Sequence, residues 1–399
     1  MFRRADYLLL GVSLVLTLFG LAMVSSVSVF ESYQLTTRFV TQGLQSEPSN
    51  AFYLWRSFLH VLVGLFAMLV MSIIPYRVWE RYARTIFFLS MACIVLLFIP
   101  GLGNTYGTAR SWLHLGPFNF QPSEFFKISF IFYLAVWLQK RESDISTFKE
   151  GFIPFCILLC LSTFLVAMQP DLGSFLIFSA IGVVMFFIAG GNIFHLILGA
   201  SAAGVLGLPI ILNEQYVRNR FLAFLNPSDP SISEGIGFQI KQALIAIGSG
   251  GLFGVGYGKS IQKFGYLPEV QSDTIFAAMA EELGFMRLLI VMGLFAVLIY
   301  RGYHISRNAP DRFGFMIATG ITTWIAAQTI INIAVNLALF PLTGITLPFI
   351  SYGGSSLISV LMGVGVLLNI SMHSTEENAQ FRRTARITRT KLFQRFVHD

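Results

Sequence analysis

Four acidic residues stand where a polar segment runs into an apolar one, in the stretch YLPEVQSDTIFAAMAEELGF. Glu269 and Asp273 belong to the polar part. Partial burial would raise the pKa of Asp273 toward the range of a general base, and nearby cations would lower it. Glu281 and Glu282 lie deeper, are too polar for lipid, and are expected to face a bundle interior in a structural role. Arg287 is their candidate salt-bridge partner.

Two further helix starts place an acid soon after a Gln-Pro pair. In FQPSEFFK, Glu124 and Lys127 are three residues apart and therefore share one helix face. In MQPDLGS, Asp171 can accept backbone N–H bonds at a helix start, and Gln169 is its neutral polar neighbour. A snorkelling lysine and two capping acids would explain these residues. The repeated pattern also suits a polar cavity that opens outward.

Several basic residues could bind a phosphate or an anionic head group. Arg110 stands beside a tryptophan in an outer loop with no other charge nearby. Lys259 and Lys263, with Lys241, flank or lie in a glycine-rich stretch. The string that ends in Gly-Lys-Ser resembles a Walker motif, but the position of its first glycine is occupied by Phe253. We therefore reject nucleotide binding.

An uncharged polar stretch, PLTGITLPFISYGGSS, lies before the last apolar segment. It carries Ser351, Gly353 and Gly354. The two glycines permit a close approach of the backbone to a ligand or to a neighbouring helix. Helix packing alone is a sufficient explanation, so these residues are predicted to support a site rather than to perform chemistry.

The elements that must position these residues are apolar helices. Hydrophobic residues make up 55% of the 399-residue chain and charged residues 12%. Its apolar runs are long enough to cross a hydrocarbon core of roughly 30 Å, and no alternation typical of a β-barrel is visible. We predict an all-α polytopic integral membrane protein with about ten transmembrane helices. The predicted spans are 7–29, 57–75, 85–102, 124–139, 152–168, 172–190, 193–212, 274–300, 313–338 and 355–372.

The lysines and arginines predict the orientation and the domain organisation. With Met1 inside, the inner segments are rich in them, whereas the short outer loops hold only Arg38, Arg56 and Arg110. Both termini are therefore expected in the cytoplasm. Residues 1–380 form a single transmembrane domain, with a long extracytoplasmic loop at 213–273 between the seventh and eighth helices. Residues 381–399 form a basic cytoplasmic tail suited to anionic lipid, and nucleic-acid binding is not expected.

The three cysteines, Cys93, Cys156 and Cys160, all lie in apolar spans, so a disulfide framework is not expected. No spacing of His, Cys and Asp resembles a structural metal site, and no metal ligand is assigned.

Six motifs, in chain order, resemble the SEDS family of bacterial shape, elongation, division and sporulation membrane proteins. They are GTARSW, FQPSEFFK, MQPDLG, SGGLFGVGYGKSIQKFGYLPE, SDTIFAAMAEELGF and LPFISYGGSS. The likeness spans nearly the whole chain and includes the ten-span topology. The segment KSIQKFGYLPE is more similar to the division branch, and the elongation branch is the near alternative.

This resemblance implies a peptidoglycan glycosyltransferase of the bacterial cytoplasmic membrane. Such an enzyme polymerises lipid II, the undecaprenyl-linked disaccharide-pentapeptide, on the outer face and releases undecaprenyl pyrophosphate. It also implies a class B penicillin-binding protein, which cross-links the product, as partner, together with other membrane proteins of the division or elongation machinery.

The resemblance also assigns roles to individual residues. The family's outer-loop aspartate corresponds to Asp273, and its arginine, glutamate and lysine near the fourth span correspond to Arg110, Glu124 and Lys127. The family often has His-Thr-Asp-Phe where this chain has Gln-Ser-Asp-Thr at 271–274. The acid is therefore retained, while any role of the histidine is absent.

The expected reaction begins when Asp273 takes a proton from the 4-hydroxyl of the acceptor sugar, which attacks the donor's anomeric carbon. Arg110, Lys127 and Lys263 would stabilise the leaving pyrophosphate. A divalent cation, magnesium or manganese, could bridge the pyrophosphate and an acid, but no all-protein cage is visible. Glu269 is either a ligand of that cation or a solvated loop charge.

Two other classes of function are the alternatives. A lipid II flippase needs a polar path to the cytoplasmic side, whereas the acids of this chain cluster at the outer mouth. A non-catalytic scaffold for division proteins would suit the small-residue faces but leaves Asp273 unexplained.

Overall fold

The computed structural model describes residues 5–99, 103–106, 109–115, 118–169, 171–213, 215–226 and 235–373. The backbone alone is described at 103–106, 109–110, 114–115, 118–119, 206–213 and 216. The predicted tail at 381–399 lies outside the described residues.

Each of the ten predicted spans coincides with a helix, because each is a long apolar run that must satisfy its backbone hydrogen bonds internally. The helices are α1 (Tyr7–Val27), α3 (Phe52–Ile73), α4 (Arg77–Leu96), α5 (Pro122–Lys140), α6 (Ile153–Ala167), α7 (Leu172–Ile188), α8 (Ile193–Asn213), α11 (Ile275–Arg307), α12 (Arg312–Asn336) and a final helix, Gly354–His373. The predicted helical class is confirmed.

The loops contain structure that the hydropathy pattern did not predict. In the described part of these loops, three additional helices are α2 (Val29–Thr41), α9 (Gln215–Leu225) and α10 (Ile236–Gly250), and one π-helical turn is η1 (Phe148–Phe152). The segment before α5 forms an antiparallel sheet in the order β1 (Gly103–Tyr106), β2 (Ala109–Leu115) and β3 (Phe118–Phe120). The predicted long loop at 213–273 is therefore partly helical.

Several predicted boundaries are wrong by one to two turns: α11 continues to Arg307 rather than ending at 300, α4 ends at Leu96 rather than at 102, and the largest error is at the start of α4. We expected the third span to begin at residue 85, whereas α4 begins at Arg77. Its first turns carry Arg77, Arg81 and Arg84, and Arg77 forms an ion pair with Asp311 at 3.1 Å. The prediction placed the helix start where the apolar run begins, but α4 begins earlier, in the charged stretch before that run.

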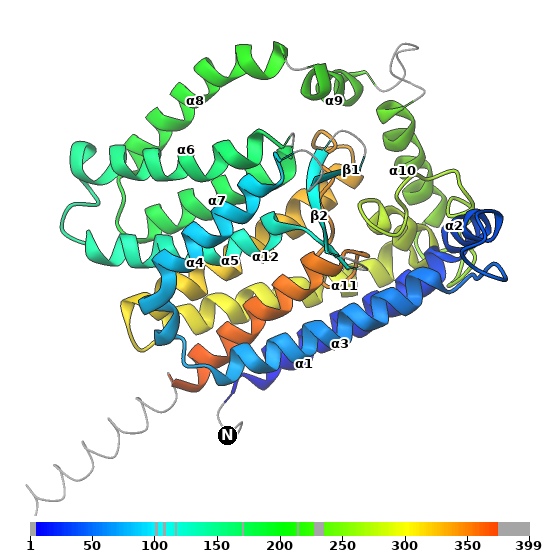
Figure 1. Ribbon diagram of the computed structural model, residues 1–399, viewed down its shortest axis with the longest axis horizontal. Coiled ribbons are helices and arrows are strands. Elements are labelled where there is room, and N and C mark those ends of the chain that lie inside the picture. Colours follow the sequence, from blue (N-terminus) through cyan, green and yellow to red (C-terminus); the bar gives the residue numbers. More distant parts are fainter. Residues whose placement is uncertain are drawn as a thin grey trace, which may run out of the picture.

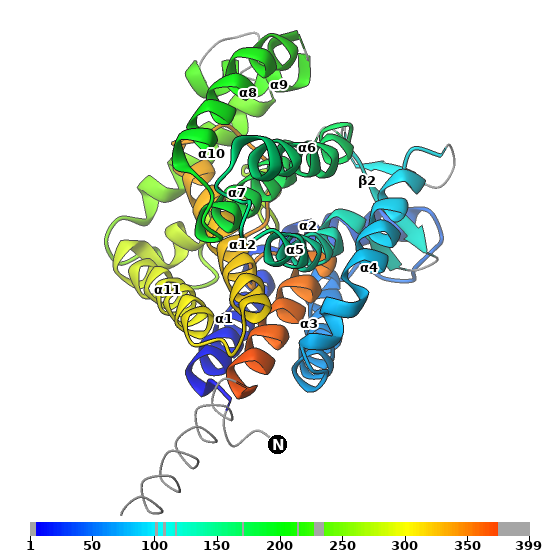
Figure 2. The same ribbon diagram turned by 90° about the vertical axis from the view of Figure 1, so that its left-hand side faces the viewer.

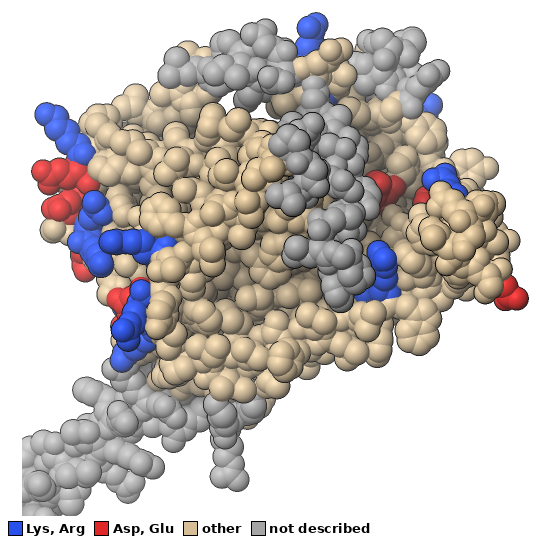
Figure 3. All heavy atoms as spheres, viewed as in Figure 1, with Lys and Arg blue, Asp and Glu red and all other residues tan. Residues whose placement is uncertain are grey.

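The surface has the form expected of a membrane protein. On the face drawn in Figure 3, charged side chains gather toward the ends of the molecule and leave an uncharged belt between them. Among the described residues, six helices are long and apolar enough to cross a membrane: α1, α3, the η1–α6 segment, α11, α12 and the final helix. The chain is a multi-pass membrane protein, and the count of ten crossings stays a prediction.

The centre of the bundle is formed by α12 and the final helix, the most buried of the long apolar helices. Helix α12 contacts α4, α5, α7, α10 and α11, and it lies among them in the end-on view of Figure 2. Helices α8, α9 and α10 form an arc at the periphery (Figure 1). The starts of α5, α7 and α11 lie at the same end of the bundle as the sheet and α2, which we call the loop end.

Candidate functional site

Asp273 lies at the loop end, in the turn directly before α11. Its side chain is half-buried, and its Oδ2 atom lies against Gly344, where an added Cβ would be 3.6 Å away. Among the described residues, no hydrogen-bond donor is assigned to this carboxylate. Asp273 is therefore an acceptor that a substrate hydroxyl could use.

The surroundings of Asp273 prepare it to accept a proton. Burial, followed by the charge of Glu269, raises the pKa of Asp273 to about 7; Arg220 lowers it and Asp171 raises it. Glu269 is exposed, whereas Asp171 and Arg220 are half-buried. A carboxyl group with a pKa near neutrality is well matched to general base catalysis.

The backbone around Asp273 is held at three consecutive carbonyl groups. The Tyr352 N–H donates to the carbonyl oxygen of Gln271 at 2.7 Å, and the Ser351 hydroxyl donates to that of Ser272 at 2.6 Å. Ser351 therefore contacts the backbone beside Asp273, and the supporting role predicted for it stays a prediction. The loop between α12 and the final helix thus fixes the backbone on one side of the aspartate.

Two asparagines of α12 hold the third carbonyl group. The Nδ2 atoms of Asn332 and Asn336 each donate to the carbonyl oxygen of Asp273 at 3.0 Å. The Asn332 amide also donates to the carbonyl oxygen of Ile345, and the Asn336 amide to that of Asn332. Both N–H groups of each amide are therefore used. Since the two amides are almost completely buried, their orientation is fixed.

Glu124 and Lys127 form a buried ion pair at 2.7 Å, with the lysine side chain 1% exposed. The prediction that they share a helix face is confirmed, whereas the snorkelling alternative is wrong because the ammonium group points into the bundle. Lys127 also donates to Gln328 at 3.4 Å, and Ser359 donates to Glu124 at 3.3 Å. The pair therefore joins α5 to α12 and the final helix.

The acid after the second Gln-Pro pair caps a helix, as predicted. Asp171 accepts a hydrogen bond from the Ser174 N–H at 2.9 Å at the start of α7. Gln169 is completely buried, and neither its oxygen nor its nitrogen has a hydrogen-bond partner within the described residues. Arg110 lies in β2, and its side chain is outside the described residues.

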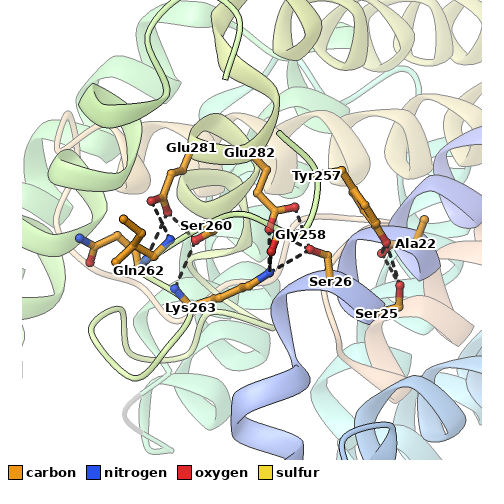
Figure 4. Close-up of polar contacts among 11 residues, drawn as sticks. Ala22, Ser25, Ser26, Tyr257, Gly258, Ser260, Gln262, Lys263, Glu281 and Glu282 are labelled. Atoms are coloured by element: carbon orange, nitrogen blue, oxygen red, sulfur yellow. Dashed lines mark hydrogen bonds and ion pairs between the residues drawn. The ribbon is translucent and has the colours of Figure 1, made fainter. Parts of the chain in front are cut away.

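The lysines of the glycine-rich loop differ in their surroundings. Lys259 is exposed and could meet a ligand, whereas Lys263 is buried and forms an ion pair with Glu282 at 3.2 Å. Glu281 and Glu282 face the interior, as predicted (Figure 4). The predicted salt bridge with Arg287 is wrong: Arg287 donates instead to a loop carbonyl oxygen.

Gly353, directly before the final helix, and Gly354, its first residue, serve close packing. A Cβ on Gly354 would lie 2.6 Å from the His60 ring of α3, and one on Gly353 would lie 3.3 Å from Thr346. The structure therefore confirms a close helix approach at Gly354.

The spacing of polar residues on α12 could have identified the two asparagines from the sequence. Gln328, Asn332 and Asn336 follow one another at intervals of four on an apolar helix, so they form one polar stripe. Arg220 gave a weaker signal, as one of two arginines and three lysines in the long loop. Within the described part of the chain, no group of three or more His, Cys, Asp or Glu side chains is arranged to hold a metal ion.

Comparison with known proteins relates this arrangement to one family. A family model for FtsW, RodA and SpoVE, described as "Cell cycle protein", matches residues 6–376. The chain is 42% identical over 373 residues to stage V sporulation protein E of Bacillus subtilis, across 92% of this chain and 97% of that one. It is 39% identical over 373 residues to a probable peptidoglycan glycosyltransferase FtsW of Trichlorobacter lovleyi, across 93% and 94% of the two chains.

A solved structure has the same fold. It is described as "Structural coordination of polymerization and crosslinking by a peptidoglycan synthase complex" and aligns with a TM-score of 0.75. The identity is 23%, and the alignment covers 93% of this chain and 99% of that one.

Proposed function

Because this chain belongs to the FtsW, RodA and SpoVE family, we propose that it is a peptidoglycan glycosyltransferase that polymerises lipid II. The relatives named FtsW support a role in septum synthesis during division. The observation that carries the proposed chemistry is Asp273, a half-buried carboxylate with a pKa of about 7 on a backbone held at three carbonyl groups.

In the proposed reaction, Asp273 accepts the proton of the acceptor sugar's 4-hydroxyl as that oxygen bonds to the anomeric carbon of the donor. The bond between that carbon and the pyrophosphate oxygen breaks, and undecaprenyl pyrophosphate leaves with the bonding electron pair. A positioned base accelerates such a step by roughly 10²–10⁴-fold. The fixed backbone around Asp273 supports this role, because a base must be held within hydrogen-bond reach of the proton.

The leaving pyrophosphate requires positive charge. We assign this role first to Arg110, Lys259 and Arg220, the last of which acts on the Asp273 carboxylate electrostatically. Lys127 and Lys263 are both buried in ion pairs, so either would contact the pyrophosphate only after its pair opened.

The described residues do not form a cation cage. A magnesium or manganese ion would need to take most of its ligands from the pyrophosphate and water, with a lone acid such as Glu269. We therefore place no step of the proposed reaction on a metal ion.

The proposed location is the bacterial cytoplasmic membrane, with both termini inside and the loop end outside. Lys and Arg in the short inner segments support this orientation. A class B penicillin-binding protein is the proposed partner, with other membrane proteins of the division machinery. The structural similarity to a chain of a peptidoglycan synthase complex supports a partnered enzyme.

Polymerisation of labelled lipid II by the purified protein, with and without its penicillin-binding partner, tests the proposed function. Glycan chains from the wild-type complex would support it. If no chains form with the partner present, the transferase proposal fails, and transport of labelled lipid II across vesicles tests the flippase alternative.

A further inference from the structure

Helix α11 is interrupted near its start, and the preceding loop fills the interruption. Gly284 has φ 75° and ψ 172°, and a Cβ there would lie 2.1 Å from the nitrogen of Gly254, so only glycine fits. The N–H groups of Val255 and Gly256 donate to carbonyl oxygens just before the break, at 2.9 and 3.0 Å. Two N–H groups just after it donate to loop carbonyl oxygens, at 2.9 and 3.1 Å. The first turns of α11 therefore form one unit with the loop.

A buried polar cluster joins the loop before α11 to the first turns of α11, and joins both of them to α1 (Figure 4). It consists of Lys263, Glu282, Glu281, Ser260 and Ser26, and we call it the lock. Lys263 Nζ contacts Glu282 at 3.2 Å, and the Ser26 hydroxyl of α1 donates to Glu282 at 2.8 Å. Glu281 accepts hydrogen bonds from the Ser260 hydroxyl at 2.5 Å and from a loop N–H at 3.0 Å.

The charges of the lock are satisfied inside the protein. Lys263 is 4% exposed and Glu282 is 0% exposed, and the lysine also donates to a loop carbonyl oxygen at 2.7 Å. Desolvating such a pair is costly, so it is weak support for overall stability. A pair of this kind is better suited to fixing one arrangement of the chain.

The contact between Lys263 and Glu282 closes the chain segment from 263 to 282 into a loop, which we call the ring, and Asp273 belongs to this segment. Lys263 and Glu282 are 19 residues apart, and Asp273 lies about midway between them. Within the ring, the backbone at 271–273 is held from the other side by α12 and the last loop. Breaking the lock would free one side of the ring while leaving the other contacts in place.

We infer that Lys263 and Glu282 are positioning residues that hold Asp273 in its catalytic place by locking the loop before α11 onto α11 and α1. This inference rests on the proposed glycosyltransferase function. It changes the role expected of Lys263 from binding pyrophosphate to holding the loop. A base displaced by about 1 Å can lose on the order of 100-fold in rate, whereas substrate binding through distant contacts changes little.

The test compares purified full-length variants with the penicillin-binding partner present. Lys263→Met alone leaves Glu282 buried without its cation and is at risk of misfolding, so the decisive variant is Lys263→Met/Glu282→Gln, which removes both charges. The matched control is Asp6→Asn/Arg301→Met, because that ion pair of 2.5 Å also joins α1 to α11. It lies at the opposite ends of both helices, far from the ring.

Three quantities are measured: kcat and KM for labelled lipid II, thermal stability in detergent, and hydrogen exchange at the 255–261 amides. We expect the lock variant to lose about 10- to 100-fold in kcat, with KM changed less than about threefold and with faster exchange in the loop. The control variant should keep its kcat and its loop exchange.

The other outcomes overturn the inference in distinct ways. A wild-type kcat in the folded lock variant would show that the lock does not position Asp273. A raised KM with normal kcat and unchanged exchange would return Lys263 to pyrophosphate binding. Equal losses of kcat in the lock and control variants would indicate general loosening. If the wild-type complex makes no glycan, the proposed function itself fails. This outcome is distinct from the three above, in all of which the wild-type complex is active.

Discussion

The rate of polymerisation should depend on pH through the ionisation of Asp273. With a pKa of about 7, the carboxyl is roughly one-tenth ionised at pH 6, half ionised at pH 7 and nine-tenths ionised at pH 8. Because a general base acts in its ionised form, kcat/KM should rise about tenfold from pH 6 to pH 8 and then level off. An aspartate of ordinary pKa would give a flat profile over this range.

Two neighbours should move this profile in opposite directions. Glu269 raises the pKa of Asp273 and Arg220 lowers it, so Glu269→Gln should shift the midpoint to lower pH and Arg220→Gln to higher pH. Two unit charges about 6 Å apart in water interact by about 0.7 kcal/mol, which corresponds to about half a pH unit. The assay is initial-rate polymerisation of labelled lipid II at subsaturating concentration, with the partner protein present.

The controls separate ionisation of the base from damage to the enzyme. Thermal stability is measured at each pH, and rates are compared only where every variant remains folded. A flat wild-type profile, or midpoints of both variants that shift in the same direction, would refute the reasoning that an elevated pKa of Asp273 governs the rate.

Two further predictions concern the buried groups around the base. Asn332→Ala/Asn336→Ala should lower kcat at least tenfold with little change in KM and destabilise the fold by about 1–3 kcal/mol, since it leaves the buried carbonyl oxygen of Asp273 unpaired. The control is Asn369→Ala, which removes a buried asparagine away from the site and should lower stability but not kcat. Equal losses of kcat in both variants would contradict the role of Asn332 and Asn336 in holding Asp273. Lys127→Met should cost about 3–5 kcal/mol of unfolding free energy, because it leaves Glu124 buried and unpaired, whereas Lys127→Met/Glu124→Gln should recover most of that loss in chemical denaturation. If the double variant is as unstable as the single one, the pair is not coupled.

The positions of the membrane helices could be predicted from the sequence because hydrophobic length sets them. All ten predicted spans coincide with helices, although the charged start of α4 hid its first two turns. Helices α9 and α10 were missed because they lie in a long loop of mixed polarity, where packing against neighbours rather than hydropathy determines the structure.

The site could be predicted only in part. Asp273 and the Glu124–Lys127 pair were found because charged residues are costly at the edge of an apolar span. The partner of Glu282 could not be predicted, because Lys263 contacts Glu282 only when the loop before α11 folds back on that helix. Asn332 and Asn336 act on the backbone of Asp273 from another helix, and their spacing shows a shared face but not what that face contacts.

The central claim is that Asp273 is the general base of lipid II polymerisation. The most direct test is single-turnover polymerisation by wild type and by Asp273→Asn, each in complex with the penicillin-binding partner. The account predicts a folded variant that binds lipid II with near-normal affinity and makes glycan at least 100-fold more slowly. A folded variant that polymerises at the wild-type rate would contradict it and make Glu124 or Glu269 the next acid to test.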